Sequence, residues 1–373
     1  SGSIYLGISR MLVSEVAALL RASKRPLIHI GQGVRHAGGE AEFHSFSNEN
    51  NIPYVTARNA NDCADSADPL CIGRPGTFAQ RGANFAVQLC DFYLAIGTRL
   101  SLPQTGYNSK DYARNARIVQ VDIDQAELDK GTLRDPISIC MDAKEFLIEL
   151  KACLGETPDW SDWVKRCQGL RDKYPVCLPE YELEKGYVNS YYFIDVLSSL
   201  ATPDDTIVTD MGFAFQNTHQ GWKIKKGQRL LTNCGLAPMG WGLPAAVGAA
   251  FATGRRVLCI TGEGGLMMNI QELATIAHHK LPIKIFVLNN GGYLTIKQTQ
   301  QLGFEGRLMG VDKDTGLSFP DFRKVAESYG IRKSILKEHT FINHQILFNC
   351  FNHDGPHLLE IMMNPNQPQA PRA

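Results

Sequence analysis

The stretch that decides the fold runs from Arg256 to Gly292 and has the sequence RVLCITGEGGLMMNIQELATIAHHKLPIKIFVLNNGG. Two apolar, β-prone runs, 256–261 and 283–288, each end in a glycine-containing turn, which predicts two buried strands. The residues between them, 267–277, have the composition of a helix. Because the ends of neighbouring strands in an open parallel sheet meet at one crevice, we expect the two turns to lie close together.

These two turns carry an acid and an amide. Glu263 follows the first strand and Asn290 follows the second, at an offset of 290 − 263 = 27. A carboxylate and an amide oxygen are hard ligands suited to Mg²⁺. Gly264 and Gly265 allow backbone N–H groups to approach a phosphate closely. The alternative is an ordinary strand–turn–helix–strand unit with glycine turns.

Strand-like and helix-like segments alternate along the whole chain. The clearest apolar runs are 26–30, 52–56, 92–96, 118–123, 206–210, 257–261, 283–288 and 358–361. This alternation predicts an α/β protein with two doubly wound parallel-sheet domains. We place the first domain at 1–155, a connector rich in charge, Trp, Tyr and Pro at 156–188, and the second domain at 189–373. The Pro- and Asn-rich tail, 364–371, is expected to be flexible.

Composition excludes several classes of partner. The 373 residues hold 38 Lys and Arg against 38 Asp and Glu, so no net field favours nucleic acid or an anionic membrane. No apolar run is long enough to cross a bilayer. The ten cysteines form no Cys-x-x-Cys pair, which indicates reduced thiols in a cytoplasmic protein.

The two turns together resemble the diphosphate-binding signature of thiamine-diphosphate (ThDP) enzymes, in which Gly-Asp-Gly is followed by Asn-Asn at the same offset. The surrounding text, MNIQELATI and LPIKIFVLNNGGY, is similar to the acetolactate synthase branch of that family. The resemblance implies a Mg²⁺ site. Glu263 stands in the place of the family's Asp ligand, Asn290 gives its side-chain oxygen, and Gly292 gives a backbone oxygen.

The resemblance also implies where ThDP binds. Gly264 and Gly265 place N–H groups on the diphosphate, helped by the positive N-terminus of the helix that follows. Met239, in the stretch GLAPMGWGLPAA (235–246), matches the apolar residue that holds the cofactor in its bent form. Taken alone, Met239 would be a core methionine at a helix N-terminus. Gly212, in Asp210-Met211-Gly212, matches the glycine of the family's Asp-x-Gly and is assigned to the cofactor.

The first half is similar to the central, Rossmann-like domain of the same family, on the segments 74–77, 82–87, 91–100 and 121–127. In some members this domain holds FAD or an ADP-containing group, and the loop 31–39 is where a pyrophosphate would lie. An empty structural domain is the alternative. The family's pyrimidine-binding domain, which supplies a catalytic glutamate, has no counterpart here. We therefore expect a fragment of a longer protein, or a chain completed by another, with no turnover alone.

Some positions depart from the acetolactate synthase pattern. The usual Gln-His-Gln after Gly212 is replaced by Phe213-Ala214-Phe215, and Thr299 stands where a pocket tryptophan is usual. A different or larger acceptor is implied. Lys297 and Arg307 would either meet an acidic substrate or be solvated surface charges.

The predicted function is ThDP- and Mg²⁺-dependent decarboxylation or carboligation of a 2-keto acid, in a homodimer or homotetramer. Neither nucleic acid nor a membrane is an expected partner. Two alternatives stay open. One is a lyase acting on a 2-hydroxyacyl-CoA or oxalyl-CoA thioester. The other is a non-catalytic ThDP-binding subunit.

Overall fold

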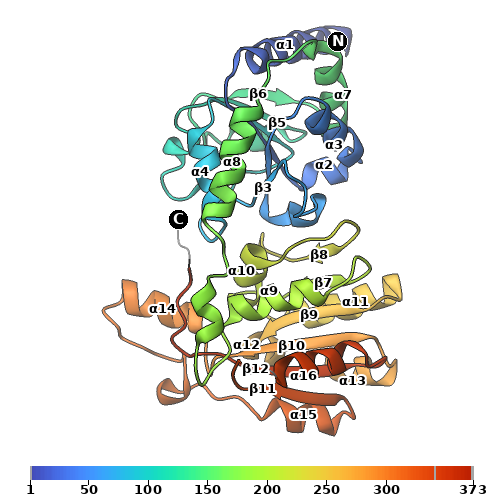
Figure 1. Cartoon of the computed structure of the whole chain (residues 1–373), viewed down its shortest axis with the longest axis vertical. Coiled ribbons are helices and arrows are strands. Elements are labelled where there is room, and N and C mark those ends of the chain that lie inside the picture. The colour runs from blue at the N-terminus through green and yellow to red at the C-terminus, as the bar shows by residue number, and fades with distance from the viewer. Residues whose placement is uncertain (1, 340–341, 371–373) are drawn as a thin grey trace. The chain divides into compact units, whose positions relative to one another are not determined.

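The computed structural model describes residues 2–339 and 342–370. It divides into two compact units, one formed by Ser1–Pro175 with Ala370–Ala373 and the other by Val176–Gln369. Each unit holds one six-stranded sheet whose strand pairs are all parallel (Figure 1). Helices flank both sheets, so the predicted α/β class with two doubly wound sheets is confirmed.

The sheet of the first unit has the strand order β3-β2-β1-β4-β5-β6. Its strands are β1 (Pro26–Ile30), β2 (Tyr54–Thr56), β3 (Cys71–Gly73), β4 (Phe92–Ile96), β5 (Arg117–Asp122) and β6 (Ile137–Cys140). Its helices are α1 (Gly2–Ala22), α2 (Gln32–His36), α3 (Glu40–Glu49), α4 (Arg81–Leu89), α5 (Leu102–Thr105), α6 (Gln125–Asp129), α7 (Ala143–Leu154) and α8 (Ser161–Lys173). Helices α1, α3 and α7 pack on one face, and α4 and α8 on the other.

The strand order of this sheet reverses between β1 and β4, where a ligand crevice is expected in such folds. The loops after these strands touch through glycines. Gly33 N donates to Gly97 O at 2.9 Å, and a Cβ on Gly31 would lie 2.1 Å from the same oxygen. Close packing of the two loops therefore explains the glycines at 31 and 33, and they do not by themselves indicate FAD or ADP.

Helix α8 lies inside the segment expected to connect the two domains. It packs on α4, because a Cβ on Gly82 would lie 2.7 Å from Leu170 O. Trp163 is buried and its indole Nε1 donates to Pro26 O at 2.8 Å. This part of the segment 156–188 is thus a packed element of the first unit.

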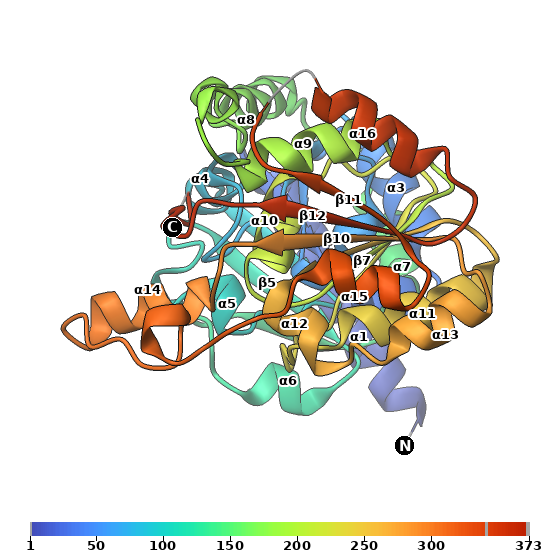
Figure 2. The ribbon, with the colours of Figure 1, turned by 90° about the horizontal axis from the view of Figure 1, so that it is seen from below.

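The sheet of the second unit has the strand order β11-β12-β10-β9-β7-β8. Its strands are β7 (Thr206–Thr209), β8 (Arg229–Leu231), β9 (Val257–Gly262), β10 (Ile283–Asn289), β11 (Arg332–Leu336) and β12 (His357–Met362). Its helices are α9 (Ser190–Leu200), α10 (Phe213–Gly221), α11 (Gly242–Thr253), α12 (Glu263–Met268), α13 (Glu272–His278), α14 (Leu294–Gly303), α15 (Phe322–Ser328) and α16 (Ile342–Phe351). Figure 2 shows α9 and α16 on one face of the sheet and α11, α13 and α15 on the other.

Two local expectations for the second unit were wrong. The single helix predicted over 267–277 is divided into α12 and α13, because Asn269 leaves the helical conformation at φ −137° and donates to Gly240 O at 2.7 Å. The described part of the tail, 364–370, is held by hydrogen bonds at Gln367. Gln367 is 2% exposed, and its side chain accepts from Ser190 N and donates to Ser190 Oγ.

No helix within 2–339 or 342–370 is long and apolar enough to cross a membrane. All ten cysteines are free thiols in the structure.

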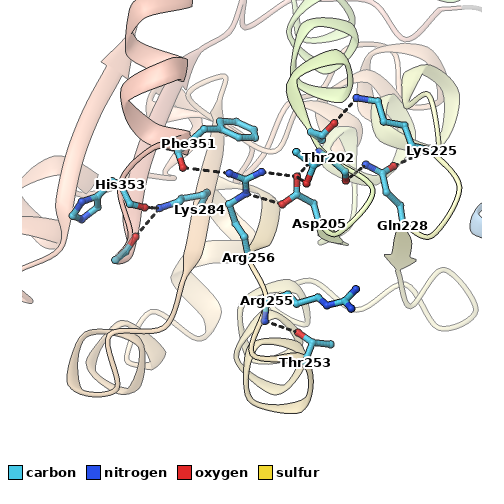
Figure 3. A network of polar contacts seen from close by, with 12 residues as sticks. Thr202, Asp205, Lys225, Gln228, Thr253, Arg255, Arg256, Lys284, Phe351 and His353 are labelled. Atoms are coloured by element: carbon cyan, nitrogen blue, oxygen red, sulfur yellow. Dashed lines mark hydrogen bonds and ion pairs between the residues drawn. The ribbon is translucent and has the colours of Figure 1, made fainter.

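A network of hydrogen bonds and ion pairs connects the residues at the amino-terminal ends of the strands of the second sheet (Figure 3). Arg256, before β9, donates from Nε and Nη2 to the two carboxylate oxygens of Asp205, before β7, at 2.6 and 2.8 Å. Asp205 also accepts from Thr202 N at 2.6 Å, and the Arg256 guanidinium lies 4.5 Å from the centre of the Phe351 ring. Lys284, at the start of β10, donates to Gly355 O at 2.7 Å. This network lies at the edge opposite the strand ends that carry Glu263 and Asn290.

Replacing Asp205 by Asn should lower the free energy of unfolding of the second unit by about 3 kcal/mol, the low end for a broken buried ion pair, because Arg256 is 24% exposed. Asp205 is 2% exposed and Arg256 is left without its counter-charge. The matched control is Asp204→Asn, because Asp204 is 81% exposed and its pair with Arg255 lies at the surface. That change should cost at most about 0.5 kcal/mol. Denaturant unfolding measures both, and equal effects of the two changes would contradict the role given to the network.

Candidate cofactor and metal site

Glu263 joins the turns that follow β9 and β10. It is the first residue of α12 and is 1% exposed. Its Oε1 accepts from the backbone N–H groups of Asn290 and Gly292, both at 2.9 Å. The structure therefore brings the acid and the Asn-Asn turn together, as their positions at two strand ends predicted. These turns lie beside the switch in strand order between β7 and β9.

The Glu263 carboxylate is buried without a counter-charge. Burial raises its pKa to about 7, although the backbone N–H groups of the Asn290–Gly292 turn act in the opposite direction. Among the described residues, no cationic side chain forms an ion pair with it. The described part of the chain also has no cluster of three or more His, Cys, Asp and Glu side chains that would hold a metal. A divalent cation bound by one carboxylate, one amide oxygen and one carbonyl fits this donor set.

The Gly292 carbonyl is aimed by its neighbours. The next peptide N–H, that of Tyr293, donates to Val311 O at 2.8 Å. Because a trans peptide is planar, the Gly292 oxygen must point to the side opposite Val311. A Cβ on Gly292 would lie 2.1 Å from Val311 O, so only glycine fits beneath this strand-like bridge.

Asp210, directly after β7, joins two further segments to the same site, at Gly240 and Thr261. Its carboxylate accepts from Met211 N at 2.8 Å, Gly240 N at 3.0 Å and Thr261 Oγ1 at 3.2 Å. Burial raises its pKa, and the hydrogen bonds from these segments act against that rise. A Cβ on Gly265 would lie 2.4 Å from Asp210 Oδ2, so this glycine is required by the packing of Asp210.

Two side chains converge on Gly264. A Cβ there would lie 2.2 Å from the Tyr293 ring and 2.8 Å from the terminal methyl of Met239. Met239 is thus placed at the turn that we assign to the diphosphate. The sequence did not single out Tyr293, although an aromatic residue directly after the second glycine pair was a usable signal. Gly212 has φ +70°, which favours glycine, and is the N-cap of α10.

The residues that depart from the acetolactate synthase pattern lie in varied surroundings. Phe213 and Phe215 are 5% and 4% exposed. Thr299 is exposed and its Oγ1 donates to Thr295 O. Lys297 pairs with Asp312 at 3.2 Å, and this pair holds the segment that accepts the Tyr293 N–H. Its charge is therefore neutralised within the chain, whereas Arg307 lies at the surface near Glu305.

Two family models match the chain. The model of the thiamine pyrophosphate enzyme C-terminal TPP-binding domain matches residues 210–361, which contain Asp210, Glu263 and Gly292. The model of the thiamine pyrophosphate enzyme central domain matches residues 13–150. The chain belongs to the thiamine pyrophosphate enzyme family. Thiamine pyrophosphate is another name for ThDP, so the family predicted from the two turns is confirmed.

Curated relatives of this family include large subunits of acetolactate synthase. The chain is 29% identical to the acetolactate synthase isozyme 1 large subunit of Escherichia coli K12, over 95% of the chain and 61% of that protein. It is 32% identical to a probable acetolactate synthase large subunit of Methanocaldococcus jannaschii, over 95% of the chain and 60% of that protein. It is 32% identical to the acetolactate synthase large subunit of Cyanidium caldarium, over 87% of the chain and 55% of that protein. The chain thus spans about three-fifths of these relatives' length.

Without divalent metal, the stability of the second unit should fall as pH rises from about 4.5 to about 7. The folded-state pKa of Glu263 is raised from 4.5 to about 7, so the folded state binds more protons than the unfolded state in this window. The unfavourable contribution is absent below pH 4.5 and complete above pH 7. Its size is about 3 kcal/mol at 1.36 kcal/mol per pKa unit.

Calorimetric unfolding in EDTA across this pH range tests the expectation. Glu263→Gln removes the titrating carboxyl and should flatten the dependence. An unchanged slope in the variant would show that Glu263 does not cause it.

Proposed function

We propose that the protein containing this chain is a ThDP- and Mg²⁺-dependent enzyme that decarboxylates a 2-keto acid or ligates the resulting fragment to an acceptor. The observation that carries the proposal is the buried Glu263 carboxylate. It lies at the strand ends of a TPP-binding domain and has no counter-charge among the described residues. It accepts hydrogen bonds from the backbone N–H groups of Asn290 and Gly292.

The Mg²⁺ ligands of this proposal are the Glu263 carboxylate, the Asn290 side-chain oxygen and the Gly292 carbonyl. Glu263 Oε1 already binds two N–H groups, so the carboxylate is oriented before any metal arrives. The Tyr293–Val311 hydrogen bond orients the Gly292 carbonyl in the same way. Pre-orientation of this kind reduces the ordering that binding requires.

The ThDP diphosphate is proposed to lie against Gly264 and Gly265, in the first turn of α12. The first N–H groups of a helix lack intrahelical acceptors and favour anions. Gly212 and Met239 complete the proposed contacts with the cofactor. When bound, ThDP supplies an electron sink for the carbanion that decarboxylation leaves.

For the substrate, we propose a 2-keto acid donor and an acceptor whose identity is left open. The acetolactate synthase relatives support a 2-keto acid as donor. Thr299 is exposed and small where a tryptophan is usual, which favours an acceptor other than a second molecule of pyruvate. The sequence left open whether Lys297 meets an acidic substrate or is a solvated surface charge, and its pair with Asp312 makes it poorly suited to bind an acidic substrate. A cytoplasmic homodimer or homotetramer remains part of this proposal.

Titration calorimetry of ThDP with and without Mg²⁺ tests the metal site. Glu263→Gln keeps an oxygen acceptor for the N–H groups of Asn290 and Gly292 but removes the negative charge. We expect Mg²⁺-dependent affinity for ThDP to fall by at least about tenfold, a size typical of lost metal-site contacts. Asp205→Asn, at the far edge of the sheet, is the control and should keep the affinity. Equal affinity of the Glu263 variant and the unmodified chain would contradict the assignment.

A steady-state assay of the complete protein with a panel of 2-keto acids and aldehydes tests the substrate class. We expect decarboxylation or ligation with an acceptor other than pyruvate, because of the Phe213-Ala214-Phe215 run and Thr299. Turnover with pyruvate alone at roughly 1–10³ per second, with acetolactate as main product, would contradict this expectation.

A further inference from the structure

A second buried glutamate lies behind the Asn-Asn turn. Glu360, on β12, is 5% exposed and neighbours β10 in the parallel sheet. Its Oε1 accepts from Asn289 Nδ2 at 2.7 Å. Its Oε2 lies 3.5 Å from Arg323 Nε, and Arg323 is held in turn by Asp321 at 3.1 Å.

This contact fixes which way the Asn289 amide faces. A carboxylate only accepts hydrogen bonds, so the amide nitrogen must face Glu360. The amide oxygen then faces the turn, where it accepts from Gly291 N at 3.0 Å. Without an acceptor at Glu360, the amide nitrogen would lose its partner and only the Gly291 N–H would hold the amide.

The consequence is that three successive backbone N–H groups are bound by side-chain oxygens. Those of Asn290 and Gly292 donate to Glu263, and that of Gly291 donates to Asn289. The peptide planes before and after Asn290 are therefore both fixed. Fixed planes on both sides of a Cα set the direction of its Cβ, so they set the point from which the Asn290 side chain extends.

We propose that Glu360 is a positioning residue for the metal site, acting through Asn289 to direct the Asn290 side chain. The inference rests on the proposed function, since Asn290 is the ligand that it positions. Glu360 is not among the ligands proposed for the metal or the cofactor. Outer partners of metal ligands typically change metal affinity by about 10- to 100-fold when they are removed.

The test measures Mg²⁺ affinity at fixed ThDP by titration calorimetry, together with thermal unfolding. Glu360→Met removes the acceptor at similar size and should weaken Mg²⁺ affinity by about 10- to 100-fold. Glu360→Gln keeps an oxygen for Asn289 and should restore most of the affinity. Asp205→Asn removes the charge of a comparably buried carboxylate at the opposite edge of the sheet (Figure 3). It should lower the unfolding temperature while Mg²⁺ affinity stays unchanged.

Asn289→Ala is a second variant that keeps the inference testable if Glu360→Met does not fold. It also tests whether Glu360 acts through Asn289. Asn289 is half-buried at a strand end, so its truncation is less disruptive than a change within β12. We expect this variant to weaken Mg²⁺ affinity, and Glu360→Met to add little in its background, because residues that act through one contact are not additive.

Three outcomes overturn the inference. Wild-type Mg²⁺ affinity in a folded Glu360→Met or Asn289→Ala protein would show that neither side chain positions the site. Additive effects of the two changes would show that Glu360 does not act through Asn289. No Mg²⁺-dependent ThDP binding by the complete protein would remove the proposed function itself, and this inference with it.

Discussion

The acceptance of two backbone N–H groups by the buried Glu263 carboxylate is the interaction on which the site depends. It links the turn after β9 to the turn after β10, and it holds a charge that no described cation neutralises. Burying such a charge is unfavourable, and the raised pKa expresses that cost. The cation that we propose would offset this cost, so the same residue underlies both the local geometry and the proposed function.

Around Glu263 the backbone is directed by hydrogen bonds more than by side-chain bulk. Asn289 and Val311 bind the N–H groups that fix the peptide planes of Asn290 and Gly292. Asp210, directly after β7, accepts hydrogen bonds from Thr261 on β9 and from the loop at Gly240. Several glycines of this region are required by these close approaches, since a Cβ on Gly265 or Gly292 would overlap a neighbouring oxygen. Glycines in this signature are therefore required by the packing of the protein, in addition to any role in letting a phosphate approach the backbone.

The parts of the fold that the sequence predicted are those with continuous apolar runs. The central strands β1, β4, β9 and β10 are buried throughout or nearly so, and their composition is sufficient to locate them. The strands β3, β6, β8 and β11 were missed. Three of them carry exposed or half-buried residues, and their pairing depends on the neighbouring strand. Likewise, the break at Asn269 and the anchored Gln367 depend on contacts with distant residues that local patterns do not contain. The spacing of Glu263 and Asn290 predicted their proximity. The contacts of Tyr293 with Val311 and of Glu360 with Asn289 join residues distant in the sequence, so local patterns do not contain them.

The most direct test is a crystal structure of this chain grown with ThDP and Mn²⁺ in place of Mg²⁺, with anomalous scattering used to locate the metal. The account predicts one peak within coordinating distance of a Glu263 oxygen, the Asn290 side-chain oxygen and the Gly292 carbonyl, beside a diphosphate on Gly264 and Gly265. A metal bound elsewhere, or ThDP bound while Glu263 makes no contact with the metal, would contradict it.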